Sequence, residues 1–224
     1  MFIALSVFIK YIIRLPHVII LLAIDFVRLT ISRYNKRFNG WGIHIYVGSF
    51  GSGKTVSMVE RAYRLACRYK DLTILTNLTL SGFPEHTVIL PLRTPQDIID
   101  APHGCLVLID EIGTIFNSRD FAVSKVSVPK VLFQHISQCR KRRMMSLGTT
   151  QKWNFLDKQL RDQSATDNVC RSYLAHPYTR ISTDYTYDSD EYDLLYPNPL
   201  SRPRPLYAYD YVQTNRIRSL YDTS

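Results

Sequence analysis

The sequence of 224 residues predicts an α/β protein in which a parallel β-sheet is flanked by helices. Short apolar runs alternate with segments of helical periodicity, which is typical of such a sheet. One apolar run leads into a glycine-rich loop and a helix, and another ends in two adjacent acidic residues. We expect three parts, namely an apolar N-terminal helix (1–32), the α/β domain (33–181) and an irregular C-terminal arm rich in Tyr and Pro (182–224).

The central domain is expected to alternate strands with helices. The segment "WGIHIYV", Trp41 to Val47, predicts a buried strand because it is apolar and ends at a glycine. Lys54 to about Tyr69 predicts a helix, because apolar residues recur on one of its faces. Further strands are predicted over 72–80, 87–92, 105–111 and 144–151, and further helices over 94–100 and 130–142.

The loop "GSFGSGKT" matches the phosphate-binding pattern G-x-x-x-x-G-K-[ST] in the strand–loop–helix context that this pattern requires. Its glycines let the backbone wrap around phosphate, and the following helix presents free N–H groups. We expect Lys54 to contact the β- and γ-phosphates of ATP and the Thr55 hydroxyl to bind Mg²⁺. The alternative, a chance glycine-rich turn, is disfavoured by the context. The predicted nucleotide contacts are Gly48, Gly51, Ser52, Gly53, Lys54 and Thr55.

Two further strand ends carry candidate catalytic residues. "CLVLIDE" ends in Asp110, which suits a direct or indirect Mg²⁺ role, and Glu111, which suits a base that polarises the attacking water. Gln151 follows the run "MMSLGTT" and is expected to sense the γ-phosphate or its water. Adjacent acids can also be solvated turn residues, and a strand-end glutamine is often only a cap. Together with the loop, these residues predict a P-loop NTPase.

The composition points to an anionic partner and a reducing compartment. The formal net charge is +9, which fits nucleic acid or a lipid surface but is a weak signal, because many soluble proteins are basic. The four cysteines lie far apart without a CxxC pair, which argues against zinc and disulfide frameworks.

Residues 1–32 are far more apolar than the rest, yet the longest charge-free part after Arg14, Leu15 to Ile24, is too short to span a bilayer. Three interpretations remain open: a tilted membrane helix, an amphipathic helix at the membrane surface, and a helix packed on the soluble domain. The polar positions fall on one narrow stripe of a helical wheel: Lys10, Arg14, His17, Asp25 and Arg28. By the positive-inside rule, a basic cluster places the C-terminal domain in the cytoplasm: Arg28, Arg33, Lys36 and Arg37.

The region from about Ile43 to Arg180 resembles the zonular occludens toxin family, the filamentous-phage assembly ATPases. These are related to the wider class of P-loop ATPases that translocate or package DNA. The resemblance rests on the order of four segments: "GSFGSGKT", "TNLTL", "LIDEIGTIFNSR" and "ISQCRKRRMMSLGTTQKWNFLDKQLRD". In that family the membrane span follows the ATPase domain, whereas here the apolar segment precedes it.

The resemblance implies a homo-oligomeric ring that binds ATP and Mg²⁺ and couples ATP hydrolysis to DNA movement during phage assembly and export. It also implies the host inner (cytoplasmic) membrane as the location and phage assembly or coat components as partners. A DNA-packaging ATPase of a membrane-containing phage is the alternative, since the compact length suits it. Alternatives of another class are a P-loop kinase and an ATP-binding assembly scaffold. A GTPase is disfavoured, because the sequence has no Asn-Lys-x-Asp motif.

Members of this class use an arginine from a neighbouring subunit. The candidates for that arginine, or for contact with DNA, are Arg119, Arg140, Arg142, Arg143 and Arg161. The run "RKRR" has two open interpretations, as a surface that holds DNA phosphates and as a solvated helix end whose cations complement the helix dipole.

The arm from residue 182 is expected to lack regular structure, because an acidic stretch is followed by prolines. Eight of the fifteen tyrosines lie there, which is too aromatic for ordinary disorder. An arm that docks on a neighbour or a phage component and a peripheral hairpin on its own domain are both compatible with this composition.

Overall fold

The computed structural model describes residues 15–28, 30–31, 37–115, 137–174, 178–196, 198, 201 and 203–222. The chain divides into two units, Met1–Arg37 and Phe38–Ser224. The first unit contains a helix over residues 15–28, and the rest of the expected helix, 1–14, 29 and 32, lies outside the described residues. Within the described ranges, no helix combines the length and the hydropathy that a membrane span needs.

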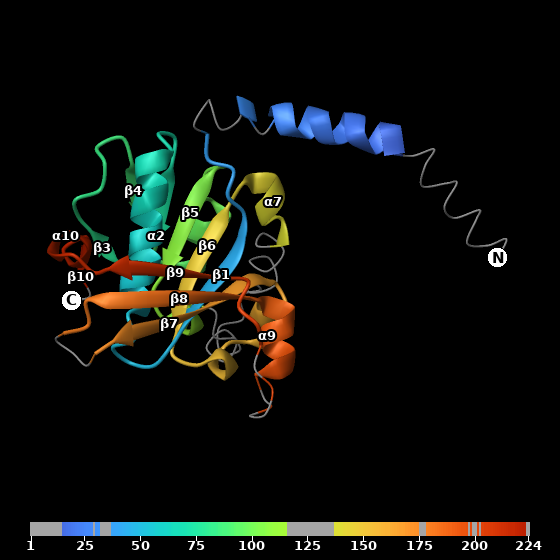
Figure 1. Ribbon diagram of the computed structural model, residues 1–224. Helices are drawn as coiled ribbons and strands as arrows, with labels where there is room; N and C mark the ends of the chain where they lie inside the picture. The colour runs from blue at the N-terminus through green and yellow to red at the C-terminus, as the bar shows by residue number, and fades with distance from the viewer. Residues whose placement is uncertain are drawn as a thin grey trace, which may run out of the picture. The chain divides into compact units, whose positions relative to one another are not determined.

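The second unit is built on an eight-stranded sheet in the order β4-β2-β5-β6-β1-β7-β8-β9 (Figure 1). The strands from β4 to β7 run parallel, which confirms the predicted parallel sheet, and β8 and β9 extend it in antiparallel fashion. Strand β6 lies between β1 and β5. The strands are β1 Gly42–Val47, β2 Thr73–Thr76, β4 Val88–Pro91, β5 Cys105–Ile109, β6 Met145–Thr150, β7 Ser164–Tyr173, β8 Ile181–Asp188 and β9 Tyr207–Val212.

Helices cover both faces of this sheet. The long helix α2, Lys54–Arg68, packs Met58 and Ala62 into one core, and Tyr46 of β1 joins the same core. Ile45, the preceding residue of β1, points to the second core on the other face, as the alternation of a strand requires. That second core is covered by α3 (Pro95–Ile99), the 3₁₀ turn η1 (Trp153–Phe155), α8 (Lys158–Arg161) and α9 (Ser189–Leu195).

The remaining elements are short. They are α4 (Ile112–Ile115), α7 (Cys139–Arg142), α10 (Asn215–Arg218) and the two-stranded sheet of β3 (Thr79–Leu80) with β10 (Tyr221–Asp222). The helix predicted over 130–142 is described only from residue 137 onward.

The strand predicted over 72–80 is divided in two at Asn77. The segment before it joins the main sheet as β2, and the segment after it pairs with β10 instead. The side chain of Asn77 bonds to the backbone of Asp110, and the Thr76 hydroxyl accepts from the Leu78 N–H at 3.1 Å. These local bonds replace the ladder bonds that would have continued the strand.

The expectation of an irregular arm over 182–224 is wrong. The predicted boundary at residue 181 falls inside β8, which pairs with β7 along its whole length, and β9 pairs with β8 in turn. The second unit extends without a division from Phe38 to Ser224, so the segment belongs to the domain itself. The four prolines fall in the connection between α9 and β9, and its described residues, 198, 201 and 203–206, form no helix or strand, as expected.

The arm was misjudged because the buried face of β8 is polar. The Ser57 hydroxyl of α2 donates to the Asp184 carboxylate at 2.7 Å, and the Thr186 hydroxyl donates to the Asn168 side chain at 2.7 Å. Asp184 and Thr186 are 6% and 1% exposed. Buried polar groups are tolerated when they are hydrogen-bonded, but their sequence pattern is that of a solvated segment.

Asp167 of β7 is an ionisable group in a similarly enclosed place. It is 0% exposed, and the Ser189 hydroxyl donates to its Oδ2 at 3.1 Å. Its Oδ1 has no hydrogen-bond partner among the described residues. The pKa of Asp167 is raised to about 8, mainly by burial. The hydrogen bond from Ser189 lowers the pKa, and the nearby carboxylates of Asp193 and Asp188 contribute to raising it.

Replacement of this carboxyl group should change the pH dependence of stability. Because the folded-state pKa of Asp167 lies above the unfolded value, the folded chain keeps a proton that the unfolded chain has released between roughly pH 4 and 8. This group therefore lowers the free energy of unfolding by up to about 1.4 kcal/mol per pH unit as the pH rises through that window. In Asp167→Asn, which cannot ionise, we expect a shallower decline in denaturant titrations from pH 5 to 8. The exposed Asp100→Asn variant is the control, and equal slopes for wild type and Asp167→Asn would contradict the assignment.

Candidate nucleotide site

The loop between β1 and α2 is shaped by glycines that no other residue replaces easily. Gly51 and Gly53 have φ angles of +74° and +93°, in the left-handed region that favours glycine. A Cβ on Gly48 would lie 2.3 Å from the Ser52 hydroxyl oxygen, so a side chain there would distort the loop. Gly53 is the N-cap of α2, and no side chain of the described residues caps this helix. The first-turn N–H groups of α2 therefore suit an anion.

Lys54 lies across this loop. Its Nζ donates to the backbone carbonyl of Ser49 at 3.1 Å and lies 5.8 Å from the centre of the Phe50 ring. The residue is only 8% exposed. A cation held over an uncapped helix start is the arrangement that binds phosphate, as the sequence predicts.

The carboxylate of Asp110 joins the loop to the neighbouring strands. Its Oδ1 accepts from the Thr55 hydroxyl at 3.0 Å and from the Thr149 hydroxyl at 2.7 Å. A hydroxyl and a carboxylate at this separation are the oxygen ligands that Mg²⁺ takes together with phosphate oxygens and water. Thr55 and Asp110 therefore fit the predicted metal role.

Glu111 occupies a backbone conformation that is rare for its residue type. Its φ is +52°, and its N–H donates to the Thr149 hydroxyl at 2.9 Å. The following residue, Ile112, packs against Gly148 of β6, where a Cβ would lie 2.5 Å from the Ile112 Cδ1. The glycine therefore allows α4 to approach β6 closely, and this close packing helps to fix the turn at Glu111.

Gln151 lies beside Glu111, and its role as a sensor of the γ-phosphate or its water stays a prediction. Its Nε2 donates to the Glu111 Oε1 at 3.4 Å. The two side chains come from the ends of β5 and β6, which are neighbours in the sheet.

Asn77 and Thr149 were not predicted as site residues. Asn77 holds the backbone of Asp110 with two bonds, because its Nδ2 donates to the Asp110 carbonyl at 3.0 Å and its Oδ1 accepts from the Asp110 N–H at 2.9 Å. Thr149 is 0% exposed and contacts both acidic residues. Their place at the carboxyl ends of β2 and β6 was the available signal, since ligands of parallel sheets bind at that edge.

A cavity of about 580 Å³ unites the loop with the acidic strand end. Its lining includes Lys54, Thr55, Asp110 and Glu111, the charged and metal-binding residues that the sequence predicts. The lining also includes four residues that sequence reasoning missed: Thr179, Gln213, Arg218 and Tyr221. Gln213, Arg218 and Tyr221 follow β9 and were not expected here, because 182–224 was predicted to be an irregular arm, whereas Thr179 precedes β8 within the predicted ATPase domain.

The predicted arginines do not line this cavity within the described ranges. Arg142 donates to the carbonyls of Ile99 and Ala101 at 2.9 and 2.6 Å, and Arg140 lies over the Trp41 ring. They and Arg143 precede β6, whereas the site lies at its other end, about 17–20 Å away along a strand of this length. Arg119 lies outside the described residues.

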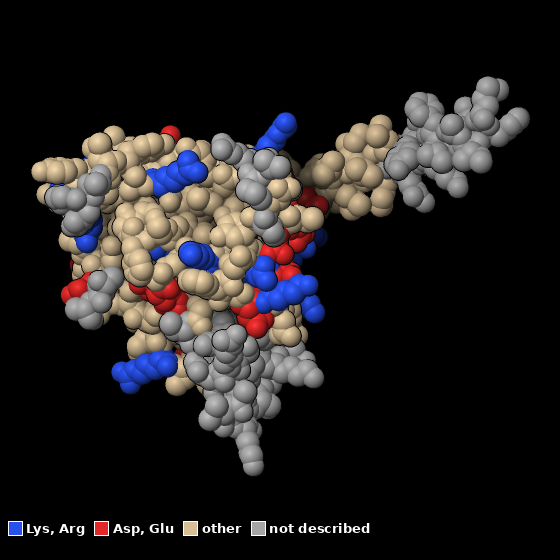
Figure 2. All heavy atoms as spheres, turned by 90° about the horizontal axis from the view of Figure 1, so that it is seen from below, with Lys and Arg blue, Asp and Glu red and all other residues tan. Residues whose placement is uncertain are grey.

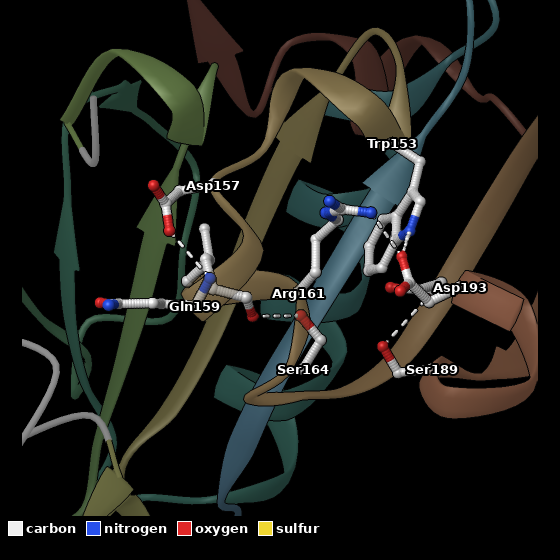
Figure 3. Close-up of polar contacts among 9 residues, drawn as sticks. Trp153, Asp157, Gln159, Arg161, Ser164, Ser189 and Asp193 are labelled. Carbon is white, nitrogen blue, oxygen red and sulfur yellow. Dashed lines mark hydrogen bonds and ion pairs between the residues drawn. The ribbon is translucent and has the colours of Figure 1, made fainter. Parts of the chain in front are cut away.

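Arg161 is engaged in a structural contact. Figure 3 shows Arg161 and Trp153 converging on Asp193 of α9. The Arg161 Nη1 lies 2.5 Å from the Asp193 Oδ1, and the Trp153 Nε1 donates to the same oxygen at 2.6 Å. Whether any of these arginines reaches the site of a neighbouring chain stays a prediction.

The structure resembles solved structures of other α/β proteins in its fold. The N-terminal domain of zonular occludens toxin from Neisseria meningitidis is 18% identical, over 82% of this chain and 100% of that domain, with a TM-score of 0.55. This likeness confirms the fold that the sequence resemblance implied. No family model and no curated protein matches the chain.

Two further structures are similar at lower TM-scores. The DNA-packaging ATPase from Sulfolobus Turreted Icosahedral Virus is 13% identical over 68% of this chain and 94% of that chain, with a TM-score of 0.46. The flagellar accessory protein FlaH from Methanocaldococcus jannaschii is 11% identical over 66% of this chain and 77% of that chain, also with a TM-score of 0.46.

The role of Thr149 can be tested with a substitution of similar shape. Thr149→Val removes the hydroxyl that contacts Asp110 and leaves the Glu111 N–H without this partner, so we expect a loss of about 1–3 kcal/mol in the free energy of unfolding. We also expect weaker Mg²⁺-dependent nucleotide binding, measured by calorimetry. The matched control is Thr150→Val, since among the described residues the Thr150 hydroxyl bonds to the Lys152 carbonyl alone, at 3.1 Å. The role assigned to Thr149 is wrong if both variants bind nucleotide with Mg²⁺ equally well.

Proposed function

We propose that this chain is an ATPase that couples ATP hydrolysis to DNA translocation during phage assembly and export. The single observation that carries the ATPase part is the convergence of Lys54, Thr55, Asp110 and Glu111 on one cavity. The fold shared with the zonular occludens toxin domain supports the phage-assembly part.

The proposed reaction assigns one task to each residue. Lys54 and the first-turn N–H groups of α2 bind the phosphates, while the Thr55 hydroxyl and the Asp110 carboxylate would hold Mg²⁺. A metal ion held there would supply positive charge to the phosphate oxygens. Glu111 accepts a proton from the attacking water, and Gln151, in contact with Glu111, orients that water.

We further propose a membrane-associated homo-oligomeric ring with DNA and phage assembly or coat components as partners. The apolar segment 1–32 and the basic cluster after it support attachment to the host inner membrane with the ATPase domain in the cytoplasm. The packaging ATPase of a membrane-containing phage remains the alternative within the same reaction class.

The net charge of +9 supports a DNA partner, but the positions of the charged side chains add no further support. On the face drawn in Figure 2, Lys and Arg side chains alternate with Asp and Glu side chains and form no continuous basic patch among the described residues. The exposed Arg140 and Lys141 of α7 are the proposed DNA contacts.

Loss of the proposed base should separate nucleotide binding from hydrolysis. In Glu111→Gln we expect the rate of ATP hydrolysis to fall about 10²–10⁴-fold without loss of ATP affinity, because the amide cannot accept the proton and removal of a negative charge does not weaken binding of an anion. Phosphate release and calorimetry measure the two quantities. The exposed Glu85→Gln variant should behave like wild type. An unchanged hydrolysis rate in Glu111→Gln would exclude this mechanism, and phosphate transfer only to an added acceptor would identify a kinase.

DNA should accelerate ATP hydrolysis. We expect single-stranded or double-stranded DNA to raise the rate of phosphate release, with a stimulation that declines as the salt concentration rises. The double variant Arg140→Ala with Lys141→Ala should need more DNA for half-maximal stimulation, whereas the exposed Arg93→Ala control should not. A hydrolysis rate that ignores DNA of both kinds at low salt would overturn the motor proposal and favour an ATP-binding scaffold.

A further inference from the structure

The segment from Gln213 to Asp222 crosses the outer side of the nucleotide cavity. It starts at the end of β9, where the Gln213 N–H donates to the Arg180 carbonyl at 2.7 Å, and α10 then contacts α2. It ends as β10, which pairs with β3. In Figure 1, α10 and β10 lie with β3 beside the N-terminal part of α2. We call residues 213–222 the crossing segment.

The crossing segment is anchored at its far end. The Ser81 N–H donates to the Leu220 carbonyl at 2.8 Å, and the Ser81 hydroxyl donates to the Ser219 carbonyl at 2.6 Å. The Leu220 side chain is 2% exposed. The positions of the residues between the two anchors are therefore restrained by backbone bonds on both sides.

At its start, the crossing segment reaches the phosphate-binding loop itself. A Cβ on Gly53 would lie 3.2 Å from the Gln213 Nε2 and 2.8 Å from the Ser172 hydroxyl oxygen. The Gln213 Nε2 donates to the Ser182 hydroxyl at 2.7 Å, and the Ser172 hydroxyl donates to the Ser52 carbonyl at 2.9 Å. Gln213 is 3% exposed, so this contact is part of the packed interior.

Arg218 is held in place by the same residues. Its Nε and Nη2 donate to the Gln213 Oε1 at 3.2 and 3.0 Å, and Nη2 also donates to the Thr179 carbonyl at 2.7 Å. In the part of the chain that the structure describes, Nη1 has no hydrogen-bond acceptor and Arg218 has no carboxylate within ion-pair distance. The guanidinium is thus fixed along one side by Gln213 and Thr179, and Arg218 lines the cavity.

The charged side chains of the cavity include a second cation. Its charged lining residues are Lys54, Asp110, Glu111 and Arg218, so the protein's own charges balance only when Arg218 is counted. Bound Mg²⁺ would add positive charge at Asp110, and Arg218 adds it from the segment that follows β9. Arg218 supplies the missing positive charge from the same chain.

We propose that Arg218 binds the terminal phosphates of a nucleoside triphosphate in the cavity of its own chain. This inference rests on the proposed nucleotide-binding function and adds a residue and a specificity to it. The Nη1 nitrogen donates to phosphate oxygen, while Nε and Nη2 keep their bonds to Gln213 and Thr179. The site then distinguishes triphosphate from monophosphate with cations on two sides of the phosphate chain.

Tyr221 completes this wall of the cavity. Burial raises the pKa of the Tyr221 hydroxyl, and the neighbouring Asp110 carboxylate raises it further, while Arg218 acts in the opposite direction. The hydroxyl therefore stays protonated at neutral pH.

The preceding arginine of α10 provides a matched control. Arg216 lies over the Tyr63 ring at 5.3 Å and also donates to the Tyr63 hydroxyl. It does not line the cavity. Arg216 and Arg218 therefore share a helix and a charge but differ in their access to the nucleotide.

Calorimetric titration of the full chain with ATP, ADP and AMP in the presence of Mg²⁺ tests the proposal. In Arg218→Ala we expect ATP affinity to fall roughly 10- to 100-fold, as for a lost charged hydrogen bond, and AMP affinity to change less than about two-fold. Arg218→Lys should recover part of the loss, because it restores the charge. Arg216→Ala should bind all three nucleotides like wild type.

Thermal unfolding of each variant without nucleotide separates phosphate binding from structural support. If Arg218→Ala binds ATP as tightly as wild type, or loses ATP and AMP affinity equally, the proposal is overturned and Arg218 only braces Gln213 and Thr179. Either result leaves the proposed function intact as long as the wild-type protein binds ATP and the Lys54→Ala variant does not. If wild type itself binds no ATP, both the proposed function and this inference fail.

Discussion

The carboxylate of Asp110 is the point on which the arrangement of the site depends. It accepts hydrogen bonds from hydroxyl groups of α2 and β6. The side chain of Asn77, which follows β2, forms two hydrogen bonds with the Asp110 backbone. The register of β5 against β6 places Ile109 opposite Gly148, which brings Asp110 to the edge of the sheet beside the loop. Because successive residues of a strand point to opposite faces, a shift of one residue would remove the carboxylate from both hydroxyls. The geometry of the candidate site is therefore a consequence of strand pairing.

The residues of this site that belong to a contiguous sequence pattern could be predicted from the sequence. Those brought to the site only by the order of the strands could not. The loop from Gly48 to Thr55 has a pattern that defines its own geometry, and the acidic strand end needs only its apolar run to be recognised. Asn77 and Thr149 are common polar residues without such a pattern, so their roles appear only when the strand order is known. The order itself places β6 between β1 and β5, which no local feature of the three strands specifies.

The antiparallel extension agrees with the alternative of a hairpin on the chain's own domain, but its strands were not predicted, for a different physical reason. Its buried face carries Asp184, Thr186 and Ser182, which form hydrogen bonds with α2, with β7 and with the residue that follows β9, respectively. Periodicity in hydrophobicity cannot detect a strand whose buried side is polar. The same limit applied to the arginines, because Arg142 and Arg161 were taken as available cations yet bond to backbone carbonyls and to a carboxylate. Net charge counts such residues without showing which of them are committed to the fold.

The crossing segment makes the nucleotide site a junction between parts of the chain that are far apart in sequence. Ser81 and Ser219 are separated by 138 residues, and Ser52 and Ser172 by 120. Contacts of such long range form late and slowly during folding, since much chain entropy is lost before they stabilise the structure. A ligand that touches both parts stabilises the closed structure by mass action, by about 2.7 kcal/mol at a concentration one hundred times its dissociation constant. The cell's nucleotide pool would then assist the folding of this chain. Amide hydrogens near Ser52, Ser81, Ser172 and Ser219 would exchange more slowly whenever the cavity is filled.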